Sequence, residues 1–495
     1  MVLKQLLNGI DYTILKGNKE TVINKIEFNS NSIEDNDVFV AIQGFKVDGH
    51  NWIENAILNG ASTIIVEKQI EIKEDVTVIK VNHTRMTLAQ LASNYYDNPT
   101  HKIHLVGLTG TNGKTSTTYF LKAIYDYINK PIGVIGTIGN IVGEESRESK
   151  NTTPESLQVN GVIQEMINQH INHCVMEVSS HALALHRVEG CDFNIGLFTN
   201  LSEDHLELHK NMEEYFNAKA KLFEMTTDYN IINCDDVYGQ KLIKKIKNSS
   251  AKLITYGLEK DADIKATNII CGEGYTHYTV MTPKGKTNIT IQLPGIINVY
   301  NSLAAIACAY CSGISLQYIK AGIQSLEKIK GRFEVIHKED DYKVIIDFAH
   351  TEDGLKKALE TIRPFVKGRL ILVFGVYAPE GEEGNQKRRL MSKVAAENAD
   401  IAIATSDNPK ELDPMFIINQ MAHYLQEFGA QYKSILDRKE AIEYAINMCT
   451  KEDVVLLTGK GHESYQIIGN KEIPFDEKEI VKEIIDKIKN KKKQY

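Results

Sequence analysis

The chain has 495 residues, 42% of them hydrophobic, and its 57 Lys and Arg against 65 Asp and Glu give a formal net charge of -8. This length predicts two to four domains, and the composition is that of an ordinary globular protein. The acidic balance excludes a protein whose main role is to bind nucleic acid, because the only basic run is a short C-terminal tail.

The first hundred residues alternate short β-branched segments with helical ones. Strands are expected at residues 38–42, 63–66 and 76–81, and helices at 52–59 and 85–96. Pro99 ends the last of these helices, because proline disfavours the helical conformation in the residue before it. We therefore predict a small α/β domain over residues 1–99.

A second alternating segment covers residues 100–330. Apolar strands are expected at 103–108, 132–135, 174–178, 195–199 and 229–233, with helices between them, which predicts a parallel sheet covered on both faces. An antiparallel insert at 276–293 precedes a helix near Asn301.

The third segment, residues 331–495, repeats the theme with strands at 344–347, 370–374, 401–405 and 454–457. Each of these strands ends in a polar or glycine-containing loop. Ligands of open α/β sheets bind beyond the carboxyl ends of the strands, so these loops are where we expect the chemistry.

Seven cysteines, an odd number without regular spacing, indicate reduced thiols in a reducing compartment. The N-terminus lacks the pattern of a signal peptide, and no run of about 18 apolar residues occurs. We expect a cytoplasmic protein that is not inserted in a membrane.

A phosphate-binding loop is predicted where the strand at 103–108 meets a helix. Its residues are Gly110, Thr111, Asn112, Gly113, Lys114 and Thr115, followed by Ser116. Backbone N–H groups and a helix N-terminus can surround phosphate oxygens there, while Lys114 reaches the terminal phosphates and Thr115 holds Mg²⁺. The general pattern has a glycine six residues before the lysine, where this chain has Leu108.

Two neighbouring strands end in groups that could bind a metal. Glu177 closes one strand and His205 follows the next. Because Mg²⁺ prefers oxygen ligands and keeps several waters, Glu177 and phosphate oxygens would satisfy it, and His205 could bind a second ion. Ordinary polarity at strand ends would also explain both residues.

These motifs together resemble the Mur ligase family, and within it the UDP-N-acetylmuramyl-tripeptide synthetases (MurE). The resemblance rests on segments in family order along nearly the whole chain: 107–115, 151–154, 177–187, 199–209, 215–219, 295–301, 331–334, 347–351, 407–409 and 459–463.

The resemblance implies an α/β fold of three domains: a UDP-substrate domain at 1–99, a central P-loop ATPase domain with a parallel sheet at 100–330, and a Rossmann-like amino-acid domain at 331–495. It also implies the reaction. ATP phosphorylates the D-glutamate side chain of UDP-N-acetylmuramoyl-L-alanyl-D-glutamate, and the amine of a free amino acid then displaces phosphate. Positioning and charge neutralisation carry most of such a phosphoryl transfer.

The resemblance further implies roles for single residues. Lys219 matches a lysine that the family converts to N6-carboxylysine, a carbamate able to bind magnesium; a plain surface lysine is the alternative. Lys114, Glu177, His205 and Lys219 would be catalytic, and the last three with Thr115 would bind metal. ATP would be bound by the loop residues 110–116 together with Asn298, Asn301, Arg332, Asp347 and His350. The nucleotide-peptide and the acceptor would contact Ser30, Asn151, Thr152, Thr153, Ser179, Arg187, Asp407, Asn408, Lys410, Gly459 and Glu463.

The sequence departs from the family pattern around the acceptor. The family's loop after Phe-Gly carries an Asp-Arg-Asp whose arginine grips the amino acid, whereas residues 376–384 here contain three glutamates and no arginine. Arg388 and Arg389 follow and are candidates to substitute. Lys410 stands where diaminopimelate enzymes have arginine, so it keeps the charge without the bidentate geometry. Asn29 and Asn31, which flank Ser30, also differ from the family's usual Asp and Arg.

Three functions stay open at this point. The first is a tripeptide ligase that adds meso-diaminopimelate, with L-lysine as the next choice of acceptor. The second is a paralogue that joins a different amino acid or carboxylate, and the altered loop favours it. The third is a non-catalytic nucleotide-binding regulator, against which the intact Lys114, Thr115, Glu177, His205 and Lys219 argue. A monomer is expected.

Overall fold

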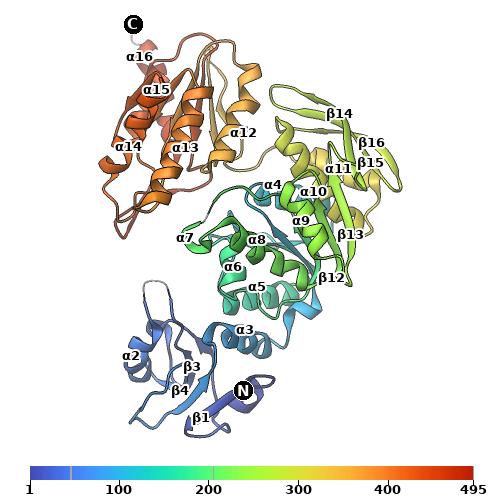
Figure 1. The fold of residues 1–495 in the computed structure, drawn as a ribbon, viewed down its shortest axis with the longest axis vertical. Helices are drawn as coiled ribbons and strands as arrows, with labels where there is room; N and C mark the ends of the chain where they lie inside the picture. The colour runs from blue at the N-terminus through green and yellow to red at the C-terminus, as the bar shows by residue number, and fades with distance from the viewer. Residues whose placement is uncertain (45–46, 205, 340, 494–495) are drawn as a thin grey trace.

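The computed structural model describes residues 1–44, 47–204, 206–339 and 341–493. Three α/β lobes follow one another along the long axis of the molecule, in chain order from the N-terminus to the C-terminus (Figure 1). Each lobe has its own sheet and its own hydrophobic clusters. The predicted α/β class, with a central P-loop domain and a C-terminal Rossmann-like domain, is confirmed.

The N-terminal lobe is a five-stranded sheet, parallel except at one edge strand. In spatial order its strands are β1 (Tyr12–Lys16), β5 (Thr77–Val81), β4 (Ala61–Val66), β3 (Asp37–Val40) and β2 (Ile26–Glu27). Its helices are α1 (Leu3–Leu6), α2 (Ile53–Leu58) and α3 (Thr84–Tyr95). Hydrophobic side chains gather in two separate clusters, because successive residues of a strand point to opposite faces of a sheet.

The central lobe is built on an eleven-stranded mixed sheet with a parallel middle. Its spatial order is β16 (Gly285–Ile291), β15 (Thr276–Thr282), β14 (Ile264–Cys271), β13 (Lys252–Gly257), β12 (Thr226–Asn233), β11 (Phe193–Phe198), β6 (His104–Thr109), β10 (His173–Glu177), β7 (Gly133–Gly136), β8 (Gly139–Val142) and β9 (Glu145–Arg147). The predicted antiparallel insert is present as β15 and β16, which continue this sheet.

Helices cover both faces of the central sheet. They are α4 (Lys114–Tyr127), α5 (Ser156–Asn168), α6 (Ser180–Ala184), α7 (Leu206–His209), α8 (Met212–Ala220), α9 (Val237–Lys245), α10 (Ile296–Cys311) and α11 (Leu316–Ser325). Val106 and Leu108 of β6 face a cluster formed with α4, α10 and α11, while Leu105 faces the opposite cluster with α5 and α8. β6 therefore has the near-continuous apolar character of a strand buried on both sides.

β6 occupies the point where the strand order reverses. The chain reaches β7 and β10 on one side of β6 and then crosses to β11 on its other side. Ligand sites of open α/β sheets lie at the carboxyl ends of strands at such a switch point. The loops that follow β6, β10 and β11 are therefore brought together at one edge of the sheet.

The C-terminal lobe has a six-stranded sheet, parallel except for its first strand. The order is β17 (Glu334–His337), β18 (Lys343–Asp347), β22 (Val454–Thr458), β19 (Leu370–Phe374), β20 (Ile401–Ala404) and β21 (Tyr432–Ser434). Its helices are α12 (Glu352–Ile362), α13 (Glu382–Asn398), α14 (Pro414–Glu427), α15 (Arg438–Asn447) and α16 (Glu477–Lys493), and a separate hairpin is formed by β23 (Tyr465–Ile468) and β24 (Lys471–Pro474).

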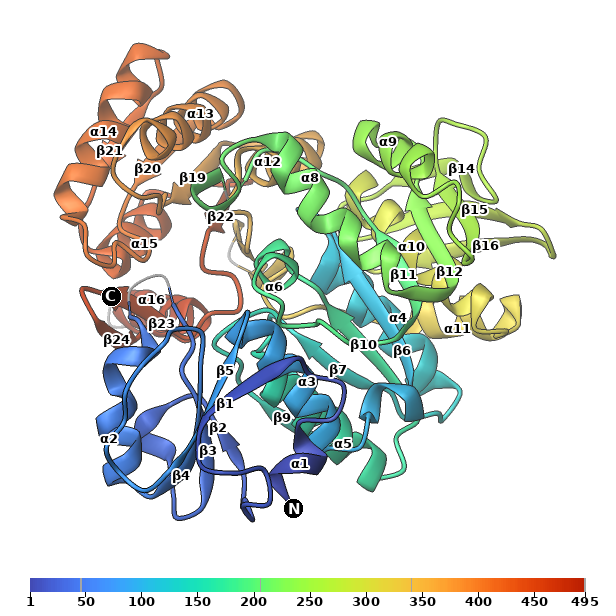
Figure 2. The ribbon, with the colours of Figure 1, turned by 60° about the horizontal axis from the view of Figure 1, so that its bottom comes forward.

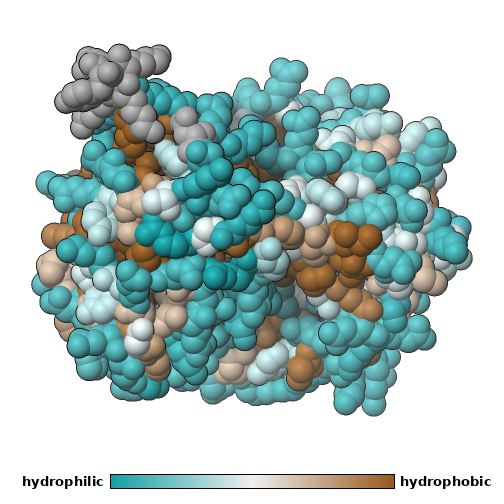
Figure 3. All heavy atoms as spheres, turned by 90° about the horizontal axis from the view of Figure 1, so that it is seen from above, coloured by the Kyte–Doolittle hydropathy of each residue, from teal (hydrophilic) through white to brown (hydrophobic). Residues whose placement is uncertain are grey.

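Polar contacts join the lobes. α3 packs beside α5, and Glu155 pairs with Arg85 of the N-terminal lobe and with Arg187 of the central lobe (Figure 2). Asn112 donates a hydrogen bond of 2.9 Å to Asp353 of the C-terminal lobe. Seen from above, the surface is largely hydrophilic with separate hydrophobic patches (Figure 3). Within the described ranges, every helix is too short or too polar to traverse a bilayer.

Candidate active site

The phosphate loop has the backbone that its glycines require. Gly110 and Gly113 have φ values of 153° and 88°, a region that favours glycine. A Cβ at Gly110 would overlap the Thr199 side chain, and one at Gly113 would overlap that of Asn301. Only glycine therefore allows the loop to pass between β11 and α10 and present its N–H groups.

Lys114 folds back over this loop. Its ammonium donates hydrogen bonds of 2.9 Å to the Gly110 carbonyl and 3.0 Å to the Thr111 carbonyl. Burial lowers the pKa of Lys114, and the nearby carboxylates of Glu177 and Asp204 oppose that shift. A half-buried ammonium that donates to two backbone carbonyls is suited to exchange them for phosphate oxygens, which carry a full charge.

Glu177 lies beneath the loop at the end of β10 and is 1% exposed. One carboxylate oxygen accepts hydrogen bonds from the hydroxyls of Thr115, at 3.0 Å, and Thr137, at 2.9 Å. Arg332 also reaches Thr115 Oγ1, at 3.3 Å. A buried carboxylate beside a threonine hydroxyl is the oxygen donor set that fits Mg²⁺, which completes its octahedron with phosphate and water. No group of three or more potential metal-ligating side chains occurs in the described segments.

Lys219 comes from α8 and is 2% exposed. Its amine donates to the Gly110 carbonyl at 2.8 Å, the same oxygen that Lys114 uses, and it lies 4.6 Å from the centre of the Tyr215 ring. Burial, and then repulsion by Lys114, lower the pKa of Lys219 well below its ordinary value. The alternative of an ordinary surface lysine is therefore wrong.

A cavity of about 250 Å³ lies between the phosphate loop and the C-terminal lobe. The five residues outside the loop that the resemblance assigns to ATP all line this cavity: Asn298, Asn301, Arg332, Asp347 and His350. Ser116 and Thr152 line it too. Asp347 accepts backbone hydrogen bonds from Phe333 and Ala349, and burial raises the pKa of its carboxyl while Arg332 opposes the shift.

A second cavity, of about 420 Å³, opens at the carboxyl ends of the C-terminal strands. Asp407, Asn408, Lys410, Gly459 and Glu463 all line it. It shares its border with the first cavity, because Asp204, Phe348 and His350 line both. A group activated in the first cavity is therefore next to a molecule bound in the second.

Lys410 enters this second cavity from an uncommon backbone conformation. Its φ is 53°, and its backbone N–H and carbonyl pair with Ile467 and Gly469 at the β23–β24 hairpin. Its ammonium lies 4.1 Å from the centre of the Tyr377 ring. A non-glycine residue in the left-handed region costs on the order of 1 kcal/mol, so the hairpin contacts fix this side chain in place.

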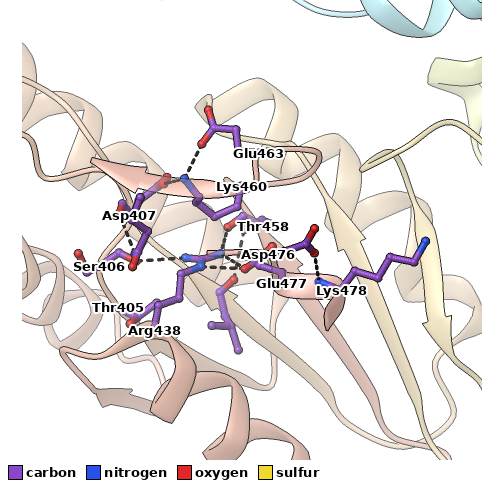
Figure 4. Close-up of polar contacts among 12 residues, drawn as sticks. Thr405, Ser406, Asp407, Arg438, Thr458, Lys460, Glu463, Asp476, Glu477 and Lys478 are labelled. Atoms are coloured by element: carbon purple, nitrogen blue, oxygen red, sulfur yellow. Dashed lines mark hydrogen bonds and ion pairs between the residues drawn. The ribbon is translucent and has the colours of Figure 1, made fainter. Parts of the chain in front are cut away.

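A buried charge cluster supports the second cavity from below (Figure 4). Arg438 and Glu477 are 0% and 1% exposed at their side chains, and two Arg438 nitrogens donate to one Glu477 oxygen at 2.8 and 2.7 Å. Arg438 also donates to the Thr458 carbonyl at 2.7 Å and to the Ser406 carbonyl at 3.4 Å. It thereby ties the ends of β20 and β22 to the start of α16.

Lys460 joins the two loops that Arg438 holds from below. Its buried ammonium donates to Glu463 at 2.5 Å (Figure 4). It also donates to Asn408 at 2.8 Å. Asp407 is packed between Gly375 and Gly459, where any side chain would meet it. Burial raises the pKa of Asp407, and Arg438 and Lys460 oppose that shift.

A third cavity, of about 440 Å³, lies in the N-terminal lobe. It is lined by Ser30 with its flanking asparagines, Trp52, Arg85 and Glu155. Through Glu155 it connects to Arg187, which donates to the Thr153 carbonyl at 3.0 Å. Ser179 exchanges hydrogen bonds with the Thr153 hydroxyl.

Asn151 stands apart from the other candidates that the structure describes. Asn151 is exposed, does not line any of these three cavities, and accepts a hydrogen bond from Ser149 at its carbonyl. His205 lies outside the described residues, so its predicted metal role is carried by the sequence alone.

The suggestion that Arg388 or Arg389 replaces the missing arginine is wrong. Arg388 is fully buried beneath the altered loop, where it donates to the Ala378 carbonyl at 2.9 Å and to Gln420 at 2.5 Å. Arg389 pairs with Glu427 on the surface. Neither side chain is among the residues that line the second cavity.

Several residues of the site had no motif to mark them. Examples are the hydrogen bonds from Thr137 to Glu177 and from Asn112 to Asp353, and the ion pair of Arg438 with Glu477. All three depend on contacts between distant parts of the chain. A buried arginine in a helix has no local sequence pattern that distinguishes it from an exposed one.

A nucleotide cavity and an acceptor cavity with a common border are what an ATP-dependent ligase needs, because it must activate a carboxylate and bring an amine to it. The chain is of that class. Family models described as "Mur ligase family, catalytic domain", "Mur ligase middle domain" and "Mur ligase, glutamate ligase domain" match residues 22–96, 108–309 and 331–461.

Similarity to named ligases extends over the whole chain. A UDP-N-acetylmuramoyl-L-alanyl-D-glutamate–2,6-diaminopimelate ligase from Clostridium perfringens is 43% identical over 98% of this chain and 100% of the relative. One of the same name from Caldanaerobacter subterraneus subsp. tengcongensis is 44% identical over 98% and 99%. A solved structure of such a ligase has a TM-score of 0.68, 27% identity, and coverage of 98% of this chain and 99% of its own. The chain belongs to the Mur ligase family.

Proposed function

We propose that this protein joins meso-diaminopimelate to UDP-N-acetylmuramoyl-L-alanyl-D-glutamate with hydrolysis of ATP to ADP and phosphate, in peptidoglycan precursor synthesis. The names of its full-length relatives support this acceptor and this nucleotide substrate. Residues 1–99 would bind the UDP-substrate, 100–330 would bind ATP, and 331–495 would bind the amino acid.

The observation that carries the proposal is the common border of the nucleotide and acceptor cavities at Asp204, Phe348 and His350. In the reaction, the terminal phosphoryl group of ATP moves to the D-glutamate carboxylate. The acceptor amine then attacks the acyl carbon and phosphate leaves. Both steps need the carboxylate at the junction of the two cavities, because the phosphoryl donor and the amine approach from different sides.

The charge on the phosphates would be balanced by this chain's own groups and by magnesium. Lys114 and the loop N–H groups would bind the phosphate oxygens, as a helix N-terminus favours anions. Thr115, Glu177, His205 and a carbamylated Lys219 would hold Mg²⁺, which supplies Lewis-acid stabilisation of charge when bound. Asn298, Asn301 and Arg332, with Asp347 and His350, would contact the rest of ATP.

Carbamylation suits Lys219 because the reaction requires a neutral amine. The amine nitrogen forms a bond to the carbon of CO₂ and loses a proton, which leaves a carbamate anion. Burial and the Lys114 charge favour the neutral amine of Lys219. The product would place an anion beside the Lys114 ammonium, which adds an attraction and supplies two oxygen ligands.

The remaining candidates would contact the two other substrates. Ser30, Asn151, Thr152, Thr153, Ser179 and Arg187 would bind the nucleotide-peptide across the border of the first two lobes. Asp407, Asn408, Lys410, Gly459 and Glu463 would bind the amino acid. We further propose that the enzyme is a monomer and works in the cytoplasm.

The test is a phosphate-release assay with purified protein, ATP, Mg²⁺ and UDP-N-acetylmuramoyl-L-alanyl-D-glutamate. Meso-diaminopimelate, L-lysine and other amino acids are offered one at a time, and the product is identified by its mass. The proposal expects the highest kcat/KM with meso-diaminopimelate. Turnover of L-lysine alone would reassign the acceptor, and absence of phosphate release with every diamino acid would refute a tripeptide ligase.

A further inference from the structure

The second cavity, which we propose binds the acceptor amino acid and call the acceptor cavity, is acidic, although the proposed acceptor carries two carboxylates. Six carboxylate side chains are among its lining residues: Glu203, Asp204, Glu352, Glu383, Asp407 and Glu463. Among the lining residues that the structure describes, the lysines are Lys387 and Lys410, and none is an arginine. Each acceptor carboxylate needs a cation in such surroundings, because like charges at close range repel.

Lys387 lies on the face of α13 that borders the cavity. Successive helical residues point about 100° apart, so Lys387, Arg388 and Arg389 face in three directions. Arg388 supports the altered loop from below and Arg389 faces the surface. Lys387 is therefore the member of this basic cluster that the helix presents to the acceptor.

The ion pair of Lys387 shows which end of the cavity it occupies. Its ammonium lies 3.5 Å from Asp204 Oδ1, and the two side chains are 28% and 6% exposed. Asp204 belongs to the central lobe and also lines the nucleotide cavity. Lys387 is therefore at the junction of the two cavities, the end at which the amine must attack. Lys410 belongs to the same lobe as Lys387 but is held at the β23–β24 hairpin.

We propose that Lys387 binds the carboxylate on the carbon that bears the reacting amine, which leaves the distal carboxylate to Lys410, at the position where diaminopimelate enzymes have arginine. This inference rests on the proposed function. Two lysines, one on helix α13 and one beside the hairpin, would thus bind the acceptor carboxylates, for which the altered loop has no arginine. On binding, the acceptor carboxylate would share Lys387 with Asp204, so that the acceptor also bridges the two lobes.

Three acceptors separate this role from a purely structural one. Meso-diaminopimelate has both carboxylates, L-lysine lacks the distal one, and 1,5-diaminopentane lacks both. Each is measured as a substrate of the full-length enzyme with ATP, Mg²⁺ and the nucleotide-peptide, or as a competitor of meso-diaminopimelate where it is not turned over. The variants are Lys387→Met, Lys387→Arg and Lys410→Met. Lys393→Met, which removes an exposed lysine from the same helix, is the control.

Lys387→Met should raise the KM or inhibition constant about tenfold for both amino acids and leave that of 1,5-diaminopentane unchanged, as expected for loss of one charged hydrogen bond. Lys387→Arg should recover most of the loss. Lys410→Met should weaken meso-diaminopimelate alone. An equal loss for all three acceptors, or no loss, would overturn the assignment. Failure of the wild-type enzyme to use any diamino acid would instead refute the proposed function.

Discussion

The buried Arg438 provides a sharp test of how the acceptor loops are held. Arg438→Met removes the cation that two hydrogen bonds join to Glu477, together with the donors to Thr458 and Ser406. The carboxylate of Glu477 then remains buried without its partner. Breaking a buried ion pair in this way costs about 3–5 kcal/mol, a large share of the roughly 5–15 kcal/mol that stabilises a domain.

The structure also predicts how the stability lost in Arg438→Met depends on Glu477 and on pH. Replacing both Arg438 and Glu477 by Met should recover most of the stability, because no buried charge is then left unpaired. Burial raises the pKa of Glu477 while Arg438 opposes the shift, so the single variant should raise that pKa further. A native carboxyl that binds a proton more readily than the unfolded one loses stability as pH rises, so the Arg438→Met defect should shrink towards acid pH.

The assay combines thermal unfolding with steady-state kinetics. We expect Arg438→Met to lower the melting temperature and to raise the acceptor KM, because loops 406–410 and 458–463 lose their common support, while the KM for MgATP stays close to that of the wild type. A free energy of unfolding of the single variant within 1 kcal/mol of the wild type would contradict this role of Arg438. A double variant no more stable than the single one would contradict it as well.

Three further predictions address other parts of the molecule. Lys219→Ala should abolish phosphate release, and millimolar formate or acetate should restore part of it by supplying a carboxylate; full activity without addition would contradict the carbamate. Gly113→Ala should raise the KM for MgATP at least tenfold because its methyl group overlaps Asn301, whereas Gly190→Ala, at a similar φ of 71° but with open space, should not. Asp453→Asn should cost about 2 kcal/mol at pH 7, because burial, which raises the pKa of Asp453, is outweighed by the hydrogen bonds from Arg369 and Thr450 together, which hold that pKa at about 2.

The sign of the Asp453 effect can be checked by acid titration. Its folded pKa lies below the ordinary 3.8, so its contribution is present above about pH 4 and is lost as the pH falls towards 2. The wild type and Asp453→Asn should therefore converge in stability near pH 2. A constant difference across this range would show that the hydrogen bonds, and not the ionised carboxylate, carry the effect.

The elements that could be predicted from the sequence are those whose structure depends on residues close together in the chain. The phosphate loop is a strand, two glycines, a lysine and a helix within about 25 residues, so neighbouring residues specify its shape without help from the rest of the fold. The strands at 370–374 and 401–405 were marked by short apolar runs, and the structure has β19 and β20 there. In both cases the physical cause of the structure lies within the segment itself.

The acceptor site could not be derived in that way. Arg438 and Glu477 are 39 residues apart, and Lys387 and Asp204 are 183 apart, so nothing near either residue predicts its partner. The conformation of residues 376–384 also depends on an arginine below it and on Gly384, where a Cβ would overlap the Pro379 carbonyl. Packing across elements therefore decides which of three consecutive basic residues lines the second cavity.

The roles proposed for Lys387 and Lys410 would explain how the altered loop can be acidic and still serve an anionic acceptor. An arginine in the loop would grip a carboxylate with a rigid fork, whereas a lysine provides a compact charge on a flexible stem. If Lys387 and Lys410 supply the cations, Glu383, the glutamate of this segment that lines the cavity, is free to face an ammonium group of the acceptor. The charges that line this cavity thus come from several elements: the lysines from α13 and from the residue held at the hairpin, and the carboxylates from loops and from the first turns of α12 and α13.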